Sequence, residues 1–242
     1  MQIKTINRRL HVPTQTRRFI TSQKQSFIGE GPERRLEGLW FVEEIWPNST
    51  VFVIGGGPSI ASMQLGLLMG QYVVGVNSAF HLDIPVAVTF FGDSRWLIWE
   101  YDSLCQKQYA GILVTCQAKL KNPDDLPIKR LAKSKKTQGI TEKRYEISWN
   151  NSSGGAAINL AYHLGARRIV LIGYDMGINN GRHNFHDSYP VGKPERNPYR
   201  HFLKSFDRIK DDADKLGVEI LNATPNSNLN VFPKVRLEDI CC

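Results

Sequence analysis

Short apolar runs that end in small or polar residues recur along this chain from residue 50 onward. Val51–Ile54 is followed by Gly55-Gly56-Gly57-Pro58-Ser59, and Tyr72–Val76 is followed by Asn77-Ser78. Continuous runs of this length are typical of strands buried on both faces, as in parallel sheets. Four further strands are expected on the same grounds, at residues 86–91, 111–116, 168–173 and 218–221.

The stretches between these runs have apolar residues at helical spacing. They predict helices over 60–69, 95–108, 156–164 and 199–216, the last two followed by glycines that suit helix C-caps. Strands that alternate with helices are typical of α/β folds. The sequence therefore predicts a doubly wound, mostly parallel Rossmann-like sheet with helices on both faces.

The length of 242 residues fits one domain with an appendage. Residues 1–33 are rich in Lys and Arg and lack periodicity, so we expect a basic N-terminal arm. Residues 34–242 are expected to form a single Rossmann-like nucleotide-binding domain, whose edge Leu36–Trp46 covers. A basic insertion at 118–146 interrupts the alternation of strands and helices.

The net charge of +8 favours anionic partners, and the positive residues gather in the arm and in the insertion. Two interpretations follow for the insertion: a lid over a bound nucleotide, or a surface for a polyanion such as DNA. We expect the lid, because the insertion follows a strand whose carboxyl end belongs to the predicted binding edge.

No apolar run approaches the roughly 20 residues that span a bilayer, and no apolar stretch follows the first basic residues. We therefore expect a cytoplasmic protein without a membrane span, in the host cell if the chain is encoded by a phage. The sequence leaves open whether it forms a homo-oligomer.

Ligands of open α/β sheets bind beyond the carboxyl ends of the strands. Glycines there let the backbone approach a phosphate, and a following helix N-terminus offers free N–H groups. Small and polar residues gather at this edge in the predicted fold, and we expect them to bind a nucleotide: Gly55, Gly56, Gly57, Pro58, Ser59, Asn77, Ser78, Asp93, Ser153, Gly154, Gly173, Tyr174 and Asp175.

Two common nucleotide-binding classes are disfavoured. Gly55–Ile60 lacks the later glycine of G-x-G-x-x-G, and Asn77 stands where a dinucleotide enzyme has an acid for the ribose. No G-x-x-x-x-G-K-[ST] sequence occurs, so the chain is not a P-loop enzyme.

The loop after the fifth strand contains His183 and His186, followed by Asp187. One histidine could act as a general base, because an unperturbed imidazole titrates near pH 6.5. The pair could instead ligate a metal or simply close a polar loop. Asp93 and Asp175 are expected to hold a ribose, an amine or a cation.

The Gly-Gly-Gly-Pro-Ser turn, Val76-Asn77-Ser78, the Ser153-Gly154-Gly155 helix start and Leu171–Asp175 together resemble one superfamily. It includes the bacterial family-42 sialyltransferases, the motility accessory factors of flagellin glycosylation and the archaeal hydroxymethylpterin diphosphokinases. The similarity covers roughly residues 51–175 and is greatest to small phage-encoded proteins of this type.

The resemblance implies a sugar-nucleotide-dependent glycosyltransferase with a CMP-sugar or another sugar nucleotide as donor. In the sialyltransferases the matching Gly-rich turn, strand-end Asn and Ser-Gly turn contact or lie beside the CMP donor, and a loop His is the catalytic base. Here that base would be His183 or His186, in the loop beyond Asp175, which is the third candidate catalytic residue, and the acceptor would be a glycan, a protein or DNA.

Two alternatives stay open. The first is a Mg²⁺-dependent phosphoryl or diphosphoryl transferase, in which Asp93 and Asp175 would hold the metal. The second is a non-catalytic protein that binds a nucleotide or a nucleic acid. Mg²⁺ is not required by the glycosyltransferase interpretation.

Overall fold

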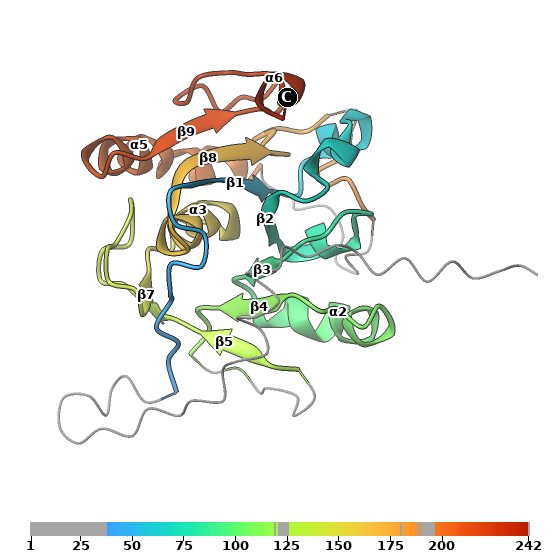
Figure 1. The fold of residues 1–242 in the computed structure, drawn as a ribbon. Helices are drawn as coiled ribbons and strands as arrows, with labels where there is room; N and C mark the ends of the chain where they lie inside the picture. Colours follow the sequence, from blue (N-terminus) through green and yellow to red (C-terminus); the bar gives the residue numbers. More distant parts are fainter. Residues whose placement is uncertain are drawn as a thin grey trace, which may run out of the picture.

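Seven parallel strands form the centre of the protein, in the order β5-β4-β3-β2-β1-β8-β9 (Figure 1). The computed structural model describes residues 38–118, 120, 126–179, 181–187, 189 and 197–241. The predicted doubly wound α/β sheet is thereby confirmed. The strands of this sheet are β1 (Ser49–Ile54), β2 (Tyr72–Val76), β3 (Val88–Phe91), β4 (Ile112–Thr115), β5 (Ile128–Arg130), β8 (Ala166–Ile172) and β9 (Glu219–Asn222).

The strand order of the sheet reverses at β1, which lies between β2 and β8. Val53 of β1 is opposite Val74 on one side and Leu171 on the other. The chain adds β2, β3, β4 and β5 on the first side and β8 and β9 on the second. In open α/β sheets the crevice at such a reversal is the usual place for a ligand.

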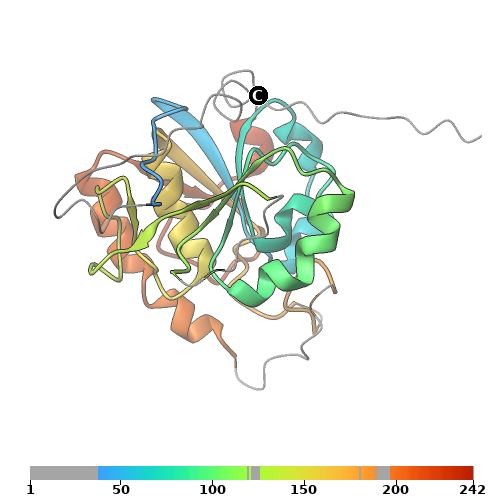
Figure 2. The same cartoon turned by 90° about the horizontal axis from the view of Figure 1, so that it is seen from below.

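Helices cover both faces of the sheet (Figure 2). Val51 and Val53 face the layer of α3 (Ser153–His163) and α5 (Phe206–Lys215). Phe52 and Ile54 face the opposite layer. Burial on both faces is the reason why the strands read as continuous apolar runs. The opposite layer holds the 3₁₀ segments η2 (Pro58–Ser62), η3 (Leu65–Leu68) and η4 (Asn77–His81), and the helices α2 (Ser94–Gln106) and α6 (Leu237–Ile240).

The helix expected over residues 60–69 is wrong. Two 3₁₀ segments, η2 and η3, take its place, and Met63 between them has extended backbone angles. Gly66 and Gly70 lower the helix propensity of this short stretch. The Gly-rich turn is therefore not followed by the N-terminus of an α-helix.

The helix expected over residues 199–216 is interrupted. It is divided into α4 (Tyr199–Leu203) and α5, with Ser205 buried at the break. The Ser205 hydroxyl accepts a hydrogen bond from the Asn151 side chain, 2.7 Å away. This bond ties the break to the segment that precedes α3.

The described part of the basic insertion is ordered into strands. β5 extends the main sheet, while β6 (Ala132–Lys133) pairs with β7 (Glu146–Ile147). The segment before β1 runs alongside the insertion: the Trp40 amide donates to the Arg130 carbonyl, and the Val42 amide donates to the Arg144 carbonyl. Of the described insertion, β5 thus forms the edge of the main sheet, while β6 and β7 form a separate two-stranded sheet.

The predicted N-terminal arm, residues 1–33, lies outside the described residues. Within the described part of the chain, no helix has the length and apolar character to cross a membrane.

Asn159 of α3 holds the second half of the insertion in place. Its side-chain oxygen accepts from the backbone amides of Thr141 and Ser148, at 3.1 and 3.0 Å. Its amide nitrogen donates to the Thr141 carbonyl at 3.0 Å. Asn159 is fully buried, so water cannot replace these bonds.

Replacement of Asn159 by alanine should therefore destabilise the protein. Two buried N–H groups and one carbonyl would lose their partners, which costs about 2–4 kcal/mol in the free energy of unfolding. Urea denaturation measures this loss. Gln106→Ala, an exposed change at the end of α2, is the control and should stay within about 0.5 kcal/mol of wild type. An equally small effect of Asn159→Ala would contradict this role.

Candidate functional site

The turns that follow β1 and β8 are packed directly against each other. The amide of Gly55 donates to the Ile172 carbonyl, and that of Gly57 donates to the Gly173 carbonyl. A Cβ atom on Gly55 would lie 2.6 Å from the Gly173 oxygen, so no side chain fits there. The glycines of the Gly-rich turn thus allow the ends of β1 and β8 to pack closely at the sheet reversal.

Asp175 fastens the Gly-rich turn to the end of β8. Its carboxylate accepts from the Ser59 amide at 3.0 Å and from the Ser59 hydroxyl at 2.7 Å. Burial raises the pKa of Asp175, and the two bonds from Ser59 oppose that rise. The amide of Ser59, which the sequence offered to a phosphate, is therefore already bound to a protein carboxylate.

Asn77 lies at the end of β2 with one side-chain atom unsatisfied. Its backbone has a left-handed conformation, with φ of 53°. The carboxamide oxygen is buried and has no hydrogen-bond partner. Nearly all buried polar atoms in proteins are bonded, so this oxygen without a partner stands out among the polar atoms of the site.

Ser78, the next residue, is fully engaged behind the site. Its hydroxyl donates to the Glu100 carboxylate at 2.6 Å and accepts from the Trp96 indole at 3.2 Å. The second oxygen of Glu100 lies 2.7 Å from Nε2 of His81. Ser78 therefore positions the turn that carries Asn77, and its hydroxyl is occupied by a protein carboxylate.

Sequence reasoning missed Glu100. The sequence does indicate that Glu100 is buried, because Glu100 falls at helical spacing with the apolar residues Trp96, Leu97 and Leu104. An acid on the apolar face of a helix needs partners inside the protein.

Asp93 caps the N-terminus of α2. One oxygen accepts from the Arg95 amide at 2.9 Å, and the other pairs with the Arg95 guanidinium at 2.7 Å. The bonds from Arg95 lower the pKa of Asp93. The guanidinium also lies 5.7 Å from the centre of the Trp99 ring.

The start of α3 contributes backbone groups to the same edge. Ser152 is the N-cap, and its hydroxyl accepts from the Gly155 amide at 3.0 Å. Ser153 and Gly154 form the first turn, where backbone amides have no acceptor within the helix. The Tyr174 hydroxyl donates to the Gly154 carbonyl at 3.0 Å, and burial raises the pKa of Tyr174.

The histidine loop lies against the Gly-rich turn. The Phe185 amide donates to the Gly56 carbonyl at 3.0 Å. His183 stacks on Tyr199 with ring centres 5.9 Å apart. His186 meets the Tyr189 ring edge-on at 4.6 Å, and burial lowers the pKa of His186.

One cavity of about 1280 Å³ joins these features across the reversal of the sheet. Among the predicted site residues, Pro58, Ser59 and Ser78 do not line it. The predicted residues that do line it are Gly55, Gly56, Gly57, Asn77, Asp93, Ser153, Gly154, Gly173, Tyr174, Asp175, His183 and His186.

The cavity wall also contains residues that sequence reasoning did not single out. Most are aromatic or cationic, and they come from α2, from α4 and from the loops that follow β4, β7 and β8. Apolar periodicity assigns such side chains to a core, so no local signal separates them from packing residues. They include Arg95, Trp99, Gln117, Trp149, Arg182, Tyr189, Tyr199 and Phe202.

The charges around the cavity nearly cancel. Arg95 is paired with Asp93, and Arg182 is paired with Asp187 at 2.8 Å, while Asp175 is bound to Ser59. None of the described insertion residues lines the cavity. The lid expected from the insertion is therefore wrong for the part of it that the structure describes.

The two carboxylates suggested for Mg²⁺ both have protein partners, Arg95 for Asp93 and Ser59 for Asp175. Among the described residues, no three or more His, Cys, Asp or Glu side chains form a group that could hold a metal ion.

No protein-family model matches the chain, and neither the curated proteins nor the solved structures provide a match. The resemblance to the sialyltransferase superfamily stays a prediction, and the geometry of the cavity is the evidence on function.

The packing of the two turns predicts that Gly57→Ala destabilises the fold itself. The new Cβ would lie 1.8 Å from an Asp175 oxygen and 2.6 Å from the Gly173 oxygen. We expect a loss of about 1–3 kcal/mol in thermal or urea unfolding. Gly66→Ala is the matched control, because its Cβ meets no atom within 4 Å. Equal stability of the two variants would contradict the clamp between the turns.

Proposed function

We propose that the cavity binds a sugar nucleotide and that the protein transfers its sugar to an acceptor hydroxyl. The observation that carries this proposal is the buried Asn77 oxygen without a partner at the end of β2. A ribose hydroxyl or the exocyclic amine of a base could donate to it. Binding would then remove the cost of leaving a buried acceptor unsatisfied.

The surroundings of Asn77 suit the other parts of such a ligand. The aromatic walls offer flat apolar surface for a base or a sugar ring. The amides of Ser153 and Gly154 begin an α-helix of 11 residues, whose N-terminus favours an anion. Arg182 adds a cation that a phosphate could share with Asp187.

The charge of the cavity supports a lightly charged donor. Its wall carries three aspartates and two arginines, counting Asp93, Asp175 and Asp187 against Arg95 and Arg182. A nucleoside triphosphate would bring several negative charges into this setting, whereas a nucleoside monophosphate sugar brings a single phosphodiester charge. The glycosyltransferase proposal therefore fits these residues better than phosphoryl transfer does.

A loop histidine would serve as the general base. The acceptor hydroxyl attacks the anomeric carbon of the sugar, and the bond from that carbon to the phosphate oxygen breaks. The hydroxyl proton passes to an imidazole nitrogen, while the nucleotide leaves with the bonding electrons. His186 suits this role, because burial lowers its pKa and keeps it neutral at neutral pH.

Nucleotide binding is tested by the variant Asn77→Gly. Glycine tolerates the left-handed backbone and removes the carboxamide. We expect about a tenfold weaker Kd for the nucleotide that binds best among CMP, CDP, UDP, GDP and ADP, measured by calorimetry with and without Mg²⁺. Asn226→Gly is the control, because Asn226 also has a positive φ and is exposed. Absence of any nucleotide binding, or equal Kd values for both variants, would refute the proposal.

The base is tested by His186→Ala and His183→Ala, with hydrolysis of the bound sugar nucleotide as the readout. Both variants should keep the nucleotide Kd, and His186→Ala should lose about a hundredfold or more in turnover. A base with a lowered pKa is neutral above that pKa. The wild-type rate should therefore rise with pH to a plateau, which is reached at a lower pH than with an unperturbed imidazole. Full turnover in both variants would exclude this role for the loop.

A further inference from the structure

The described part of the insertion carries a marked excess of positive charge outside the cavity. Residues 126–148 contain Lys129, Arg130, Lys133, Lys135, Lys136, Lys143 and Arg144, against Glu142 and Glu146. Three of the seven cations are neutralised by neighbours: Lys136 pairs with Asp212, Lys143 with Glu146 and Arg144 with Glu44.

The other four cations, Lys129, Arg130, Lys133 and Lys135, form no ion pair with any described carboxylate, and we call them the basic edge. They fall within seven consecutive residues, which include the last two residues of β5 and all of β6. An extended segment of this length spans about 20 Å, which is enough to contact several phosphates of a polymer.

Burial lowers the pKa of Lys129, because its ammonium group has lost part of its hydration, and the Glu43 carboxylate opposes this shift without forming an ion pair with Lys129. A phosphate oxygen at this place would replace the lost water. A group of closely spaced cations that form no ion pairs is the usual electrostatic footprint of a polyanion-binding surface.

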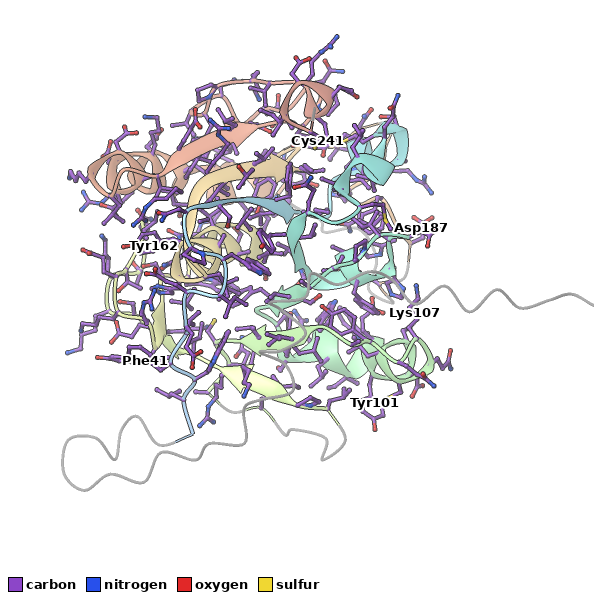
Figure 3. All side chains as sticks on the ribbon, in the orientation of Figure 1. Phe41, Tyr101, Lys107, Tyr162, Asp187 and Cys241 are labelled. Atoms are coloured by element: carbon purple, nitrogen blue, oxygen red, sulfur yellow. The ribbon has the colours of Figure 1, made fainter. Side chains whose placement is uncertain are left out.

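An exposed aromatic side chain lies beside the basic edge. The Trp40 amide donates to the Arg130 carbonyl, and the Val42 amide donates to the Arg144 carbonyl. These bonds hold the backbone on both sides of Phe41 against the insertion, and the Phe41 side chain is 57% exposed. Figure 3 shows Phe41 on the side of the molecule where this segment passes β5 and β7.

We infer that the basic edge and Phe41 bind single-stranded nucleic acid, with the lysines on the phosphates and the Phe41 ring stacked on a base. Cations alone would serve a duplex equally well, but an exposed ring needs an unpaired base. The inference does not depend on the nucleotide site.

The basic edge also reaches the rim of the cavity. The Lys133 ammonium lies 4.8 Å from the centre of the Trp149 ring, and Trp149 lines the cavity. A strand bound along β5 and β6 would pass this rim. If the proposed glycosyl transfer holds, the nucleic acid is then placed as its acceptor.

Fluorescence anisotropy of a labelled 20-nucleotide oligo(dT), titrated with the full chain at several salt concentrations, tests the inference. The triple variant Lys129→Gln, Lys133→Gln, Lys135→Gln should bind at least about tenfold more weakly at low salt. Its slope of log K against log salt should be shallower by about 2, because three phosphate contacts are lost. Phe41→Ala should bind about fivefold more weakly with an unchanged slope, because stacking releases no counter-ions.

Two controls match these variants. The triple variant Lys107→Gln, Lys204→Gln, Lys215→Gln removes the same charge at exposed lysines without ion pairs. Ile98→Ala removes another exposed apolar side chain, on α2. Both controls should bind oligo(dT) like wild type.

Equal losses in the two lysine variants, or no binding by wild type, would overturn the inference. Tighter binding of a duplex, together with no effect of Phe41→Ala, would overturn the single-strand assignment. The nucleotide titration of the same variants reports separately on the cavity, and their melting temperatures report on folding.

Discussion

The contact between the Gly-rich turn and the end of β8 decides the geometry of the whole binding edge. β1 and β8 are adjacent strands at the sheet reversal, and their following turns meet without intervening side chains. The Asp175 carboxylate completes the contact by binding the amide and the hydroxyl of Ser59. The histidine loop contacts the Gly-rich turn through the hydrogen bond from the Phe185 amide to the Gly56 carbonyl. Any rearrangement of the clamp would therefore move the cavity floor and the histidines together.

Buried polar groups near the ends of β2 and β8 differ in whether they have a hydrogen-bond partner. Behind the cavity, Ser78 and His81 satisfy the buried Glu100 carboxylate, and in the cavity wall Asp175 is satisfied by Ser59. Within the cavity, the Asn77 oxygen has no partner. Buried polar atoms are rarely left without a hydrogen bond, so the Asn77 oxygen is the atom of the cavity wall on which the proposal of a ligand rests. This contrast gives the sugar-nucleotide proposal its physical basis.

The excess positive charge of the chain is separated from the cavity. The cavity wall balances its arginines with aspartates, whereas the basic edge carries cations without carboxylate partners in the described structure. The excess positive charge of the chain therefore does not have one electrostatic role at the cavity. This separation is the reason why we propose a ligand of low charge for the cavity and a polymer of phosphates for the basic edge.

The sequence by itself determined six of the seven strands of the main sheet, because strands buried on both faces are apolar throughout and stand out as runs between turns. It also determined which residues follow each strand, and therefore which groups gather at the carboxyl edge. It could not determine their partners: the Ser59 amide is taken by Asp175, 116 residues further along the chain. Likewise, the insertion has no periodicity that would predict its strands. These strands form only by pairing with other segments, β5 with β4 and β6 with β7. Hydrogen bonds and ion pairs between distant segments depend on the packed fold, so only the tertiary structure decided which polar groups are satisfied and which remain open to a ligand.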